Sequence, residues 1–160
     1  MLIRPATSAD AEAILAIILP VIRAGETYAL DRAMGEGEAI AYWMGADKAV
    51  FVAEEEGRVL GTYYLRANQA GGGGHVANCG YMVGEAGRGR GLARAMCGHS
   101  LDAARQAGFA AMQFNFVVSS NGAAVHLWQA MGFAIIGRVP GGFAHPALGF
   151  VDALVMFRDL

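Results

Sequence analysis

The run Arg88-Gly89-Arg90-Gly91-Leu92-Ala93 is the stretch of this sequence that decides the fold. It lies between an apolar segment, Tyr81-Met82-Val83, that predicts a strand and a helical pattern that continues to about Ala107. A glycine-rich turn that enters a helix leaves backbone N–H groups without acceptors at the positive end of the helix dipole. Such a turn binds phosphate, and two arginines add positive charge here. We therefore predict a phosphate-binding loop at residues 88–93.

The spacing of the glycines excludes two other phosphate-binding motifs. No Gly-Lys-Ser/Thr follows the loop, so it is not a Walker loop. Gly87, Gly89 and Gly91 alternate, and the first strand of the chain does not lead into them, so the run is not a dinucleotide-binding fingerprint. By itself the run is equally compatible with a solvated turn between a strand and a helix.

Length and composition restrict the class of protein. The chain has 160 residues, of which 55% are hydrophobic and 16% are charged, which predicts one domain over residues 1–160 with a substantial core. A net charge of −2 argues against a nucleic-acid partner. The apolar run at residues 14–22 is too short to span a membrane, and residues 1–4 do not look like a secretory leader. We expect a soluble, cytoplasmic protein without a membrane partner.

The two cysteines, Cys79 and Cys97, have neither a Cys-x-x-Cys spacing nor companion histidines. We therefore expect no metal site and interpret both as small apolar residues in a reducing compartment. Cys79 could also be read as an acyl-accepting nucleophile, but no base with which it would pair is evident.

The apolar periodicity predicts the element order β-α-α-β-β-β-α-β-α-β-β, an α+β class. The strands that enclose the long helix should run parallel through a right-handed crossover. Strands are expected at residues 2–6, 48–54, 59–67, 75–83, 111–119, 133–139 and 150–158, and helices at about residues 8–24, 36–45, 92–107 and 122–131.

A second signature follows the first by about thirty residues. The segment from Asn121 to Phe133, Asn-Gly-Ala-Ala-Val-His-Leu-Trp-Gln-Ala-Met-Gly-Phe, is by itself an ordinary helix capped by Asn121 and ended by Gly132. Together with the Arg-x-x-Gly-x-Ala pattern of residues 88–93, it resembles the motif pair of the GCN5-related N-acetyltransferases, the GNAT superfamily. In that family the first motif is the acyl-CoA pyrophosphate loop.

The resemblance implies a GNAT fold over the whole chain: a mostly antiparallel mixed sheet of about seven strands with a central splayed parallel pair and about four helices. Gly80 is an expected site for the β-bulge that often accompanies the splay. Acetyl-CoA is the implied acetyl donor, with no metal. The residues expected to bind it are Met82, Val83, Arg88, Gly89, Arg90, Gly91, Leu92, Ala93, Asn121, Ala124 and Trp128.

Trp128 departs from the family pattern, in which a tyrosine often stands there and is the proposed acid for the departing thiol. Indole cannot donate a proton at neutral pH. A positioned acid contributes roughly 10²–10⁴-fold to the rate, whereas a thiol with a pKa of about 8.5 can leave as thiolate. We expect Trp128 to pack against the pantetheine or its own helix, and another group or water to handle the proton.

The acceptor is expected opposite the donor. Asn78 and Asn115 are the candidates for catalytic residues, and Tyr28, Asn78, Asn115, Phe143 and His145 are those for substrate contact. Equally, Asn78 could be a bulge or turn residue and Asn115 a buried amide with a neighbouring loop as its partner. We interpret His75 and His126 as surface residues.

The asparagines at 78, 115 and 121, with Trp128, are similar to those of the fungal subgroup that acetylates azetidine-2-carboxylate. That resemblance implies a small amino or imino acid as the amine substrate, acetylated by direct attack. Two alternatives stay open: a protein or peptide N-acetyltransferase, and a non-catalytic acetyl-CoA-binding module. Such domains often pair through exposed strand edges, so a homodimer is compatible with the family.

Overall fold

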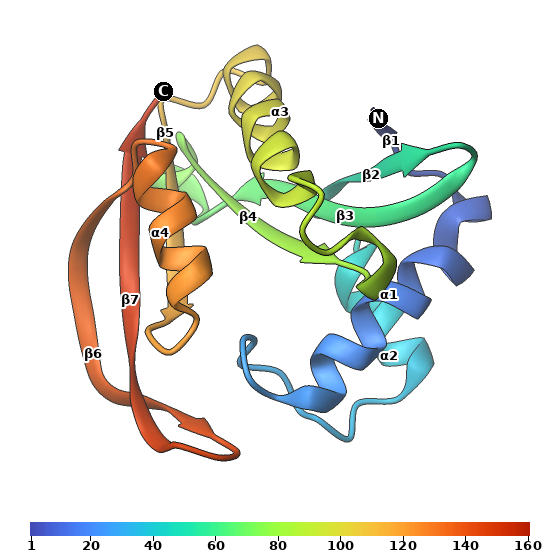
Figure 1. Ribbon diagram of the computed structural model, residues 1–160. Coiled ribbons are helices and arrows are strands. Elements are labelled where there is room, and N and C mark those ends of the chain that lie inside the picture. Colours follow the sequence, from blue (N-terminus) through green and yellow to red (C-terminus); the bar gives the residue numbers. More distant parts are fainter.

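The computed structural model describes residues 1–160 and contains one seven-stranded sheet in the order β1-β2-β3-β4-β5-β7-β6 (Figure 1). All neighbouring strands are antiparallel except β4 and β5, which are parallel. The strands are β1 (Leu2–Pro5), β2 (Ala49–Glu55), β3 (Arg58–Ala67), β4 (Val76–Val83), β5 (Ala111–Val118), β6 (Ala134–His145) and β7 (Gly149–Asp159); the helices are α1 (Ala11–Ala24), α2 (Glu36–Trp43), α3 (Leu92–Gln106) and α4 (Gly122–Ala130). The predicted element order and fold class are confirmed.

Two hydrophobic clusters hold the layers together. The larger joins α3 and α4 to one face of the sheet and includes Met96, Leu101 and Met112. The smaller joins α1 and α2 to the other face and includes Ile18 and Trp43. Because strand side chains alternate between faces, β3 and β4 contribute to both clusters.

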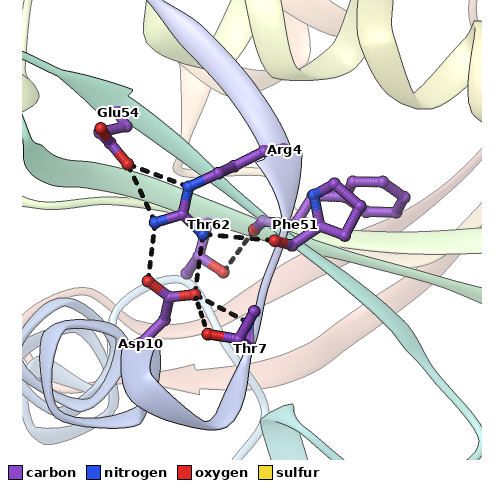
Figure 2. Close-up of polar contacts among 7 residues, drawn as sticks. Arg4, Thr7, Asp10, Phe51, Glu54 and Thr62 are labelled. Carbon is purple, nitrogen blue, oxygen red and sulfur yellow. Dashed lines mark hydrogen bonds and ion pairs between the residues drawn. The ribbon is translucent and has the colours of Figure 1, made fainter.

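A polar network fixes the first strand to the first helix and to β2 (Figure 2). The Arg4 guanidinium donates to both carboxylate oxygens of Asp10 at 2.9 Å and to Glu54 at 3.0 Å. Asp10 also accepts from the Thr7 backbone N–H at 2.7 Å, at the short 3₁₀ turn Ser8–Asp10 that precedes α1. The arginine and these donors hold the pKa of the buried Asp10 carboxyl well below its usual value.

A second polar link in the same region seats α2 on the sheet, and Figure 2 shows its Thr62–Phe51 part. The buried Thr62 hydroxyl accepts from the Trp43 indole N–H at 3.0 Å and donates to the Phe51 carbonyl at 2.9 Å. This link anchors the end of α2, whose residue Tyr42 lines the cavity described below.

The final hairpin is longer than the sequence predicts. β6 continues to His145, through residues 140–145 that were expected to form a loop, and β7 begins at Gly149. The register shifts between Val139 and Phe143, so the intervening Pro140-Gly141-Gly142 forms an irregularity within the strand. An edge strand tolerates proline and a bulge because its outer side has no ladder to complete.

Candidate active site

The site is built around the point where β4 and β5 separate (Figure 1). The strands pair only at Val76 with Ala111 and Ala77 with Met112, yet they continue to Val83 and Val118. Where pairing stops, the Asn78 side-chain amide donates to the Gln113 carbonyl at 2.9 Å. From there on, the β5-facing edge of β4 has no strand partner.

The bulge lies on β5, so its predicted location at Gly80 was wrong. The ladder between β5 and β7 shifts register between Phe114 and Val117, whereas Gly80 pairs regularly with Tyr64 of β3. Glycine is needed at position 80 for another reason. A Cβ there would lie 2.6 Å from Cε1 of Tyr64, so only glycine leaves room for that ring.

A central cavity of about 780 Å³ opens along the separated strands. Its lining comes from β3, β4 and β5, from the end of α1 and the segment after it, from the end of α2, from the loop before α3 with the first turn of that helix, and from α4. A cavity of this size can hold a cofactor or a small substrate. Predicted site residues in the lining are Tyr28, Asn78, Met82, Val83, Arg88, Gly89, Gly91, Leu92, Ala93, Asn115, Asn121, Ala124 and Trp128.

The loop before α3 presents a row of free donors to this cavity. The backbone N–H groups of residues 89–94 donate to no acceptor in the protein, and the first N–H bonded back into the loop is that of Ala95, to Gly91. Gly89 and Gly91 have φ of 72° and 76°, in the left-handed region that favours glycine. Arg88 and Arg94 line the cavity without an ion-pair partner. These donors and charges fit a pyrophosphate group.

Arg90 differs from its neighbours. Its guanidinium pairs with the carboxylate of Glu55, the last residue of β2. Arg90 is not among the residues that line the central cavity. The pattern of residues 88–93 gave no reason to separate Arg90 from Arg88, because the partner Glu55 is distant in the sequence.

The second motif forms the opposite wall. The Asn121 side chain accepts from the Ala124 backbone N–H at 3.3 Å and caps α4. Trp128 is buried, with its ring centroid 5.0 Å from that of Tyr81 and 5.1 Å from that of Phe114. The indole is therefore an apolar part of the wall.

The two candidate asparagines have different environments. Asn78 is buried, and both ends of its amide have protein partners, Gln113 and Arg66. Asn115 is exposed to the cavity and not buried; it donates to Asn68 at 2.6 Å and accepts from Gln113 at 3.0 Å. Asn115 is thus the one whose amide is open to a ligand, while Asn78 holds the strands at their branch point.

Tyr28 lies on the α1–α2 connection and lines the cavity. Its hydroxyl donates to the Tyr81 carbonyl at 2.9 Å, on the free part of β4. Burial raises the pKa of Tyr28 well above its ordinary value, so the phenol remains protonated at neutral pH.

Phe143 and His145, expected on the loop between the last two strands as substrate contacts, adjoin the central cavity without lining it. Phe143 is buried with its ring 6.1 Å from that of Phe116, which does line the cavity. His145 accepts at Nδ1 from the N–H groups of Ala147 and Leu148, at 3.1 and 3.2 Å, and so caps the hairpin turn. It borders a separate hollow of about 140 Å³.

The lining residues that were not anticipated include Tyr42, Tyr64 and Arg66. Tyr64 and Arg66 lie two apart on β3 and therefore share a face. Arg66 pairs with Asn78 in the β3–β4 register. Strand alternation in the sequence could have indicated the shared face, but only the register shows that this face lies beside Asn78.

The lining contains no aspartate, glutamate or histidine. Burial raises the pKa of the Cys79 thiol to about 12, so it remains protonated at neutral pH and is a poor nucleophile. No group of three or more His, Cys, Asp or Glu side chains is placed to hold a metal ion. None of the helices has both the length and the apolar character to cross a membrane.

Comparison with known proteins identifies the family. The model of the acetyltransferase (GNAT) family matches residues 22–133. This chain belongs to the GNAT family. A solved GCN5-related N-acetyltransferase from Kribbella flavida is 44% identical, with a TM-score of 0.95 over 99% of this chain and 97% of that one. GNAT membership makes the chain an N-acetyltransferase that uses acetyl-CoA.

Two further relatives of this GNAT protein are informative. The N-acetyltransferase aca1 of Schizosaccharomyces pombe is 26% identical in an alignment of 151 positions that covers 84% of this chain and 72% of that protein. The acetyltransferase yncA of Salmonella typhimurium, solved with acetyl-CoA, is 25% identical with a TM-score of 0.86 over 100% of this chain and 94% of that one.

Proposed function

We propose that this GNAT protein transfers an acetyl group from acetyl-CoA to the amine of a small amino or imino acid. The observation that supports the proposal most is the single cavity that connects the free N–H groups of the loop before α3 with the aromatic and amide side chains near Asn78 and Asn115. A volume of about 780 Å³ accommodates the reactive end of acetyl-CoA and a small acceptor together.

The donor half of the site has three parts. The N–H groups of residues 89–94, with Arg88 and Arg94, would hold the pyrophosphate. The free edge of β4 from residue 78 to 83 offers backbone groups to the pantetheine amides and an N–H to the thioester carbonyl. One donor aimed at a developing oxyanion is worth about 3–4 kcal/mol in other enzymes. Trp128 supplies an apolar wall.

The transfer needs no covalent enzyme intermediate. The lone pair of the neutral amine attacks the thioester carbonyl carbon, a C–N bond forms, and the C–S bond breaks. The amine loses one proton and the thiolate gains one. Because no carboxylate or imidazole lines the cavity, water carries both protons. A thiol has a pKa of about 8.5 and can leave as thiolate. The ammonium of a free amino acid is less acidic than a peptide α-amine, so the amine loses its proton to water before it attacks, and the site contributes by positioning the reactants.

The test is acetyl-CoA-dependent release of free thiol, measured over amino acids, imino acids, polyamines, aminoglycosides and short peptides. Saturable turnover with amino or imino acids supports the proposal. Turnover with peptides alone would assign the site to protein substrates instead. Failure of the whole panel, in protein that binds acetyl-CoA, would contradict the small-molecule proposal.

We also propose that the protein works in the cytoplasm as a homodimer paired through β6. This twelve-residue strand forms one edge of the sheet, and its outer side has no partner (Figure 1). Ile136 is 58% exposed on it, and Phe150 of β7 is 81% exposed. Long apolar edges of this kind favour pairing. The cytoplasmic location is supported by the two cysteines, which are both free and buried, as is usual in a reducing compartment. Sedimentation of the wild type as a monomer, or no effect of Ile136→Lys on a dimer, would contradict the pairing.

A further inference from the structure

The charged side chains that line the central cavity are all arginines. Arg88 and Arg94 lie at the loop before α3, and Arg66 lies on β3 beside Asn78, at the other end of the free segment of β4. No carboxylate in the lining offsets these charges. The two loop arginines are accounted for by the pyrophosphate, whereas Arg66 is too far along β4 from that loop to share this role. Its charge therefore faces the acceptor.

The guanidinium of Arg66 is only partly engaged by the protein. Its Nε donates to the Asn78 side-chain oxygen at 3.3 Å, and its Nη1 lies 3.6 Å from an Asp47 carboxylate oxygen. Asp47 is exposed and lies closer to Lys48, at 3.1 Å, so one carboxylate faces two cations. No contact engages Nη2 of Arg66. This corner therefore keeps a net positive charge and unused donors.

The same guanidinium is also held in place. Its Cζ lies 5.7 Å from the centre of the Tyr64 ring, in cation–π contact. That ring lies directly over Gly80, where no side chain could displace it. The Nζ of Lys48 also lies over the Tyr64 and Tyr42 rings, at 5.5 and 4.8 Å from their centres. A planar guanidinium supported in this way is well suited to bind a planar carboxylate through two hydrogen bonds.

We propose that Arg66 binds a carboxylate of the acceptor and thereby restricts the enzyme to anionic or zwitterionic amines, namely α-amino and α-imino acids. The proposal rests on the function proposed above and adds the residue that selects the substrate class. The cation disfavours polyamines, aminoglycosides and other polycationic amines, which need carboxylates around them. Asn115, open to the same cavity, is the neighbouring amide for the amine end.

The first test uses the wild-type enzyme and matched acceptors. Proline, azetidine-2-carboxylate and methionine are each compared with the corresponding carboxamide at saturating acetyl-CoA. The amide has the more acidic ammonium group and hence more free amine at neutral pH. A preference for the acid therefore cannot come from amine reactivity. We expect kcat/KM to be at least ~10-fold higher for the acids, the range of a hydrogen bond to a charged group. Equal values for acid and amide would overturn the assignment.

The second test uses variants. Arg66→Gln should raise KM for the acid by roughly 10–100-fold and KM for the amide by much less, so that the difference between acid and amide disappears. The Kd for acetyl-CoA, measured on the same variant, reports whether the donor half stays intact. Arg66→Lys keeps the charge but loses the planar pair of donors. Its KM for the acid should therefore lie between the values for the wild type and for Arg66→Gln. Arg105→Gln, which removes an exposed arginine of α3 paired with Asp102, is the matched control.

The results separate this inference from the proposed function. Turnover of small amines with no discrimination between acid and amide would contradict only the role of Arg66. Absence of turnover with any small amine, in protein with intact acetyl-CoA affinity, would contradict the proposed function itself. If Arg66→Gln fails to fold, the acid–amide comparison on the wild type and the Arg66→Lys variant still decide the matter.

Discussion

The side-chain amide of Asn78 donates to the backbone carbonyl of Gln113 at 2.9 Å, immediately beyond the last paired residues of β4 and β5. A side chain thus replaces the ladder bond that the separating strands no longer make. Its oxygen in turn accepts from Arg66 at 3.3 Å. One buried amide therefore connects the branch point of the sheet to Arg66, the cation that we propose binds the acceptor.

Asn78→Ala should impair both stability and catalysis. Loss of the amide leaves the Gln113 carbonyl and the Arg66 Nε without their partner, which should lower the free energy of unfolding by about 1–3 kcal/mol. It should also lower kcat, because the strands that hold the thioester lose their fixed separation. Urea unfolding and steady-state kinetics measure both, with Gln106→Ala on the exposed surface of α3 as the control. A stable variant with unchanged kcat would show that the bond is dispensable.

Gly91→Val should weaken acetyl-CoA binding at least ~10-fold, or about 1.4 kcal/mol. The residue has φ of 76° at the start of α3, so a branched side chain strains the backbone that aligns the free N–H groups. Gly57→Val is the control, since Gly57 has nearly the same φ, 75°, in the β2–β3 turn. Titration calorimetry gives the affinities. Equal losses in the two variants would point to general destabilisation and not to the loop.

Gly80→Ala should perturb the acceptor half more than the donor half. The added Cβ would lie 2.6 Å from the Tyr64 ring, and such overpacking costs typically 1–3 kcal/mol. Displacement of Tyr64 also removes the support of Arg66, so KM for the amine should rise by a larger factor than the Kd for acetyl-CoA. Gly98→Ala within α3, where a Cβ meets nothing within 4 Å, should instead be neutral or stabilising. An unchanged amine KM in Gly80→Ala would argue against a role for the Tyr64 ring.

Cys79→Ala should retain acetyl transfer. The buried thiol, with a pKa of about 12, is not ionised at neutral pH, so the acetyl group should pass directly to the amine. Intact-mass spectrometry of the wild type with acetyl-CoA alone should show no acetylated protein. Cys97→Ala is the matched control, because burial likewise raises the pKa of the Cys97 thiol, to about 11. An acetyl adduct on Cys79 would require a two-step mechanism.

Asp10 should contribute to the loss of stability in acid. Its folded pKa is depressed by Arg4, so its contribution is complete above the unfolded value of about 3.9 and is lost as the pH falls toward the folded value. Asp10→Asn should therefore be less stable than the wild type at pH 7, and the difference should shrink below about pH 4. Unfolding at several pH values tests this, with the exposed Asp102→Asn as the control. A difference that is independent of pH would exclude the ion pair as its source.

The local signals in the sequence were sufficient for the framework. The glycine-rich turn at residues 88–93 and the capped helix after Asn121 depend on contacts within a few residues, so the sequence predicted both correctly. The order of strands and helices follows from apolar periodicity for the same reason. Trp128 was expected to pack and not to act as an acid, because an indole cannot donate a proton at neutral pH, and its side chain is buried.

The tertiary structure decided what depends on strand register and on distant partners. Arg90 pairs with Glu55, His145 caps its own hairpin turn, and the bulge lies on β5 and not at Gly80. The place of Arg66 beside Asn78 likewise depends on pairing between β3 and β4. The sequence by itself determined the loop that we propose binds the pyrophosphate, because that loop and the helix after it form locally. Only the assembled sheet determined the acceptor site, because its side chains come from separate strands whose register sets which of them meet.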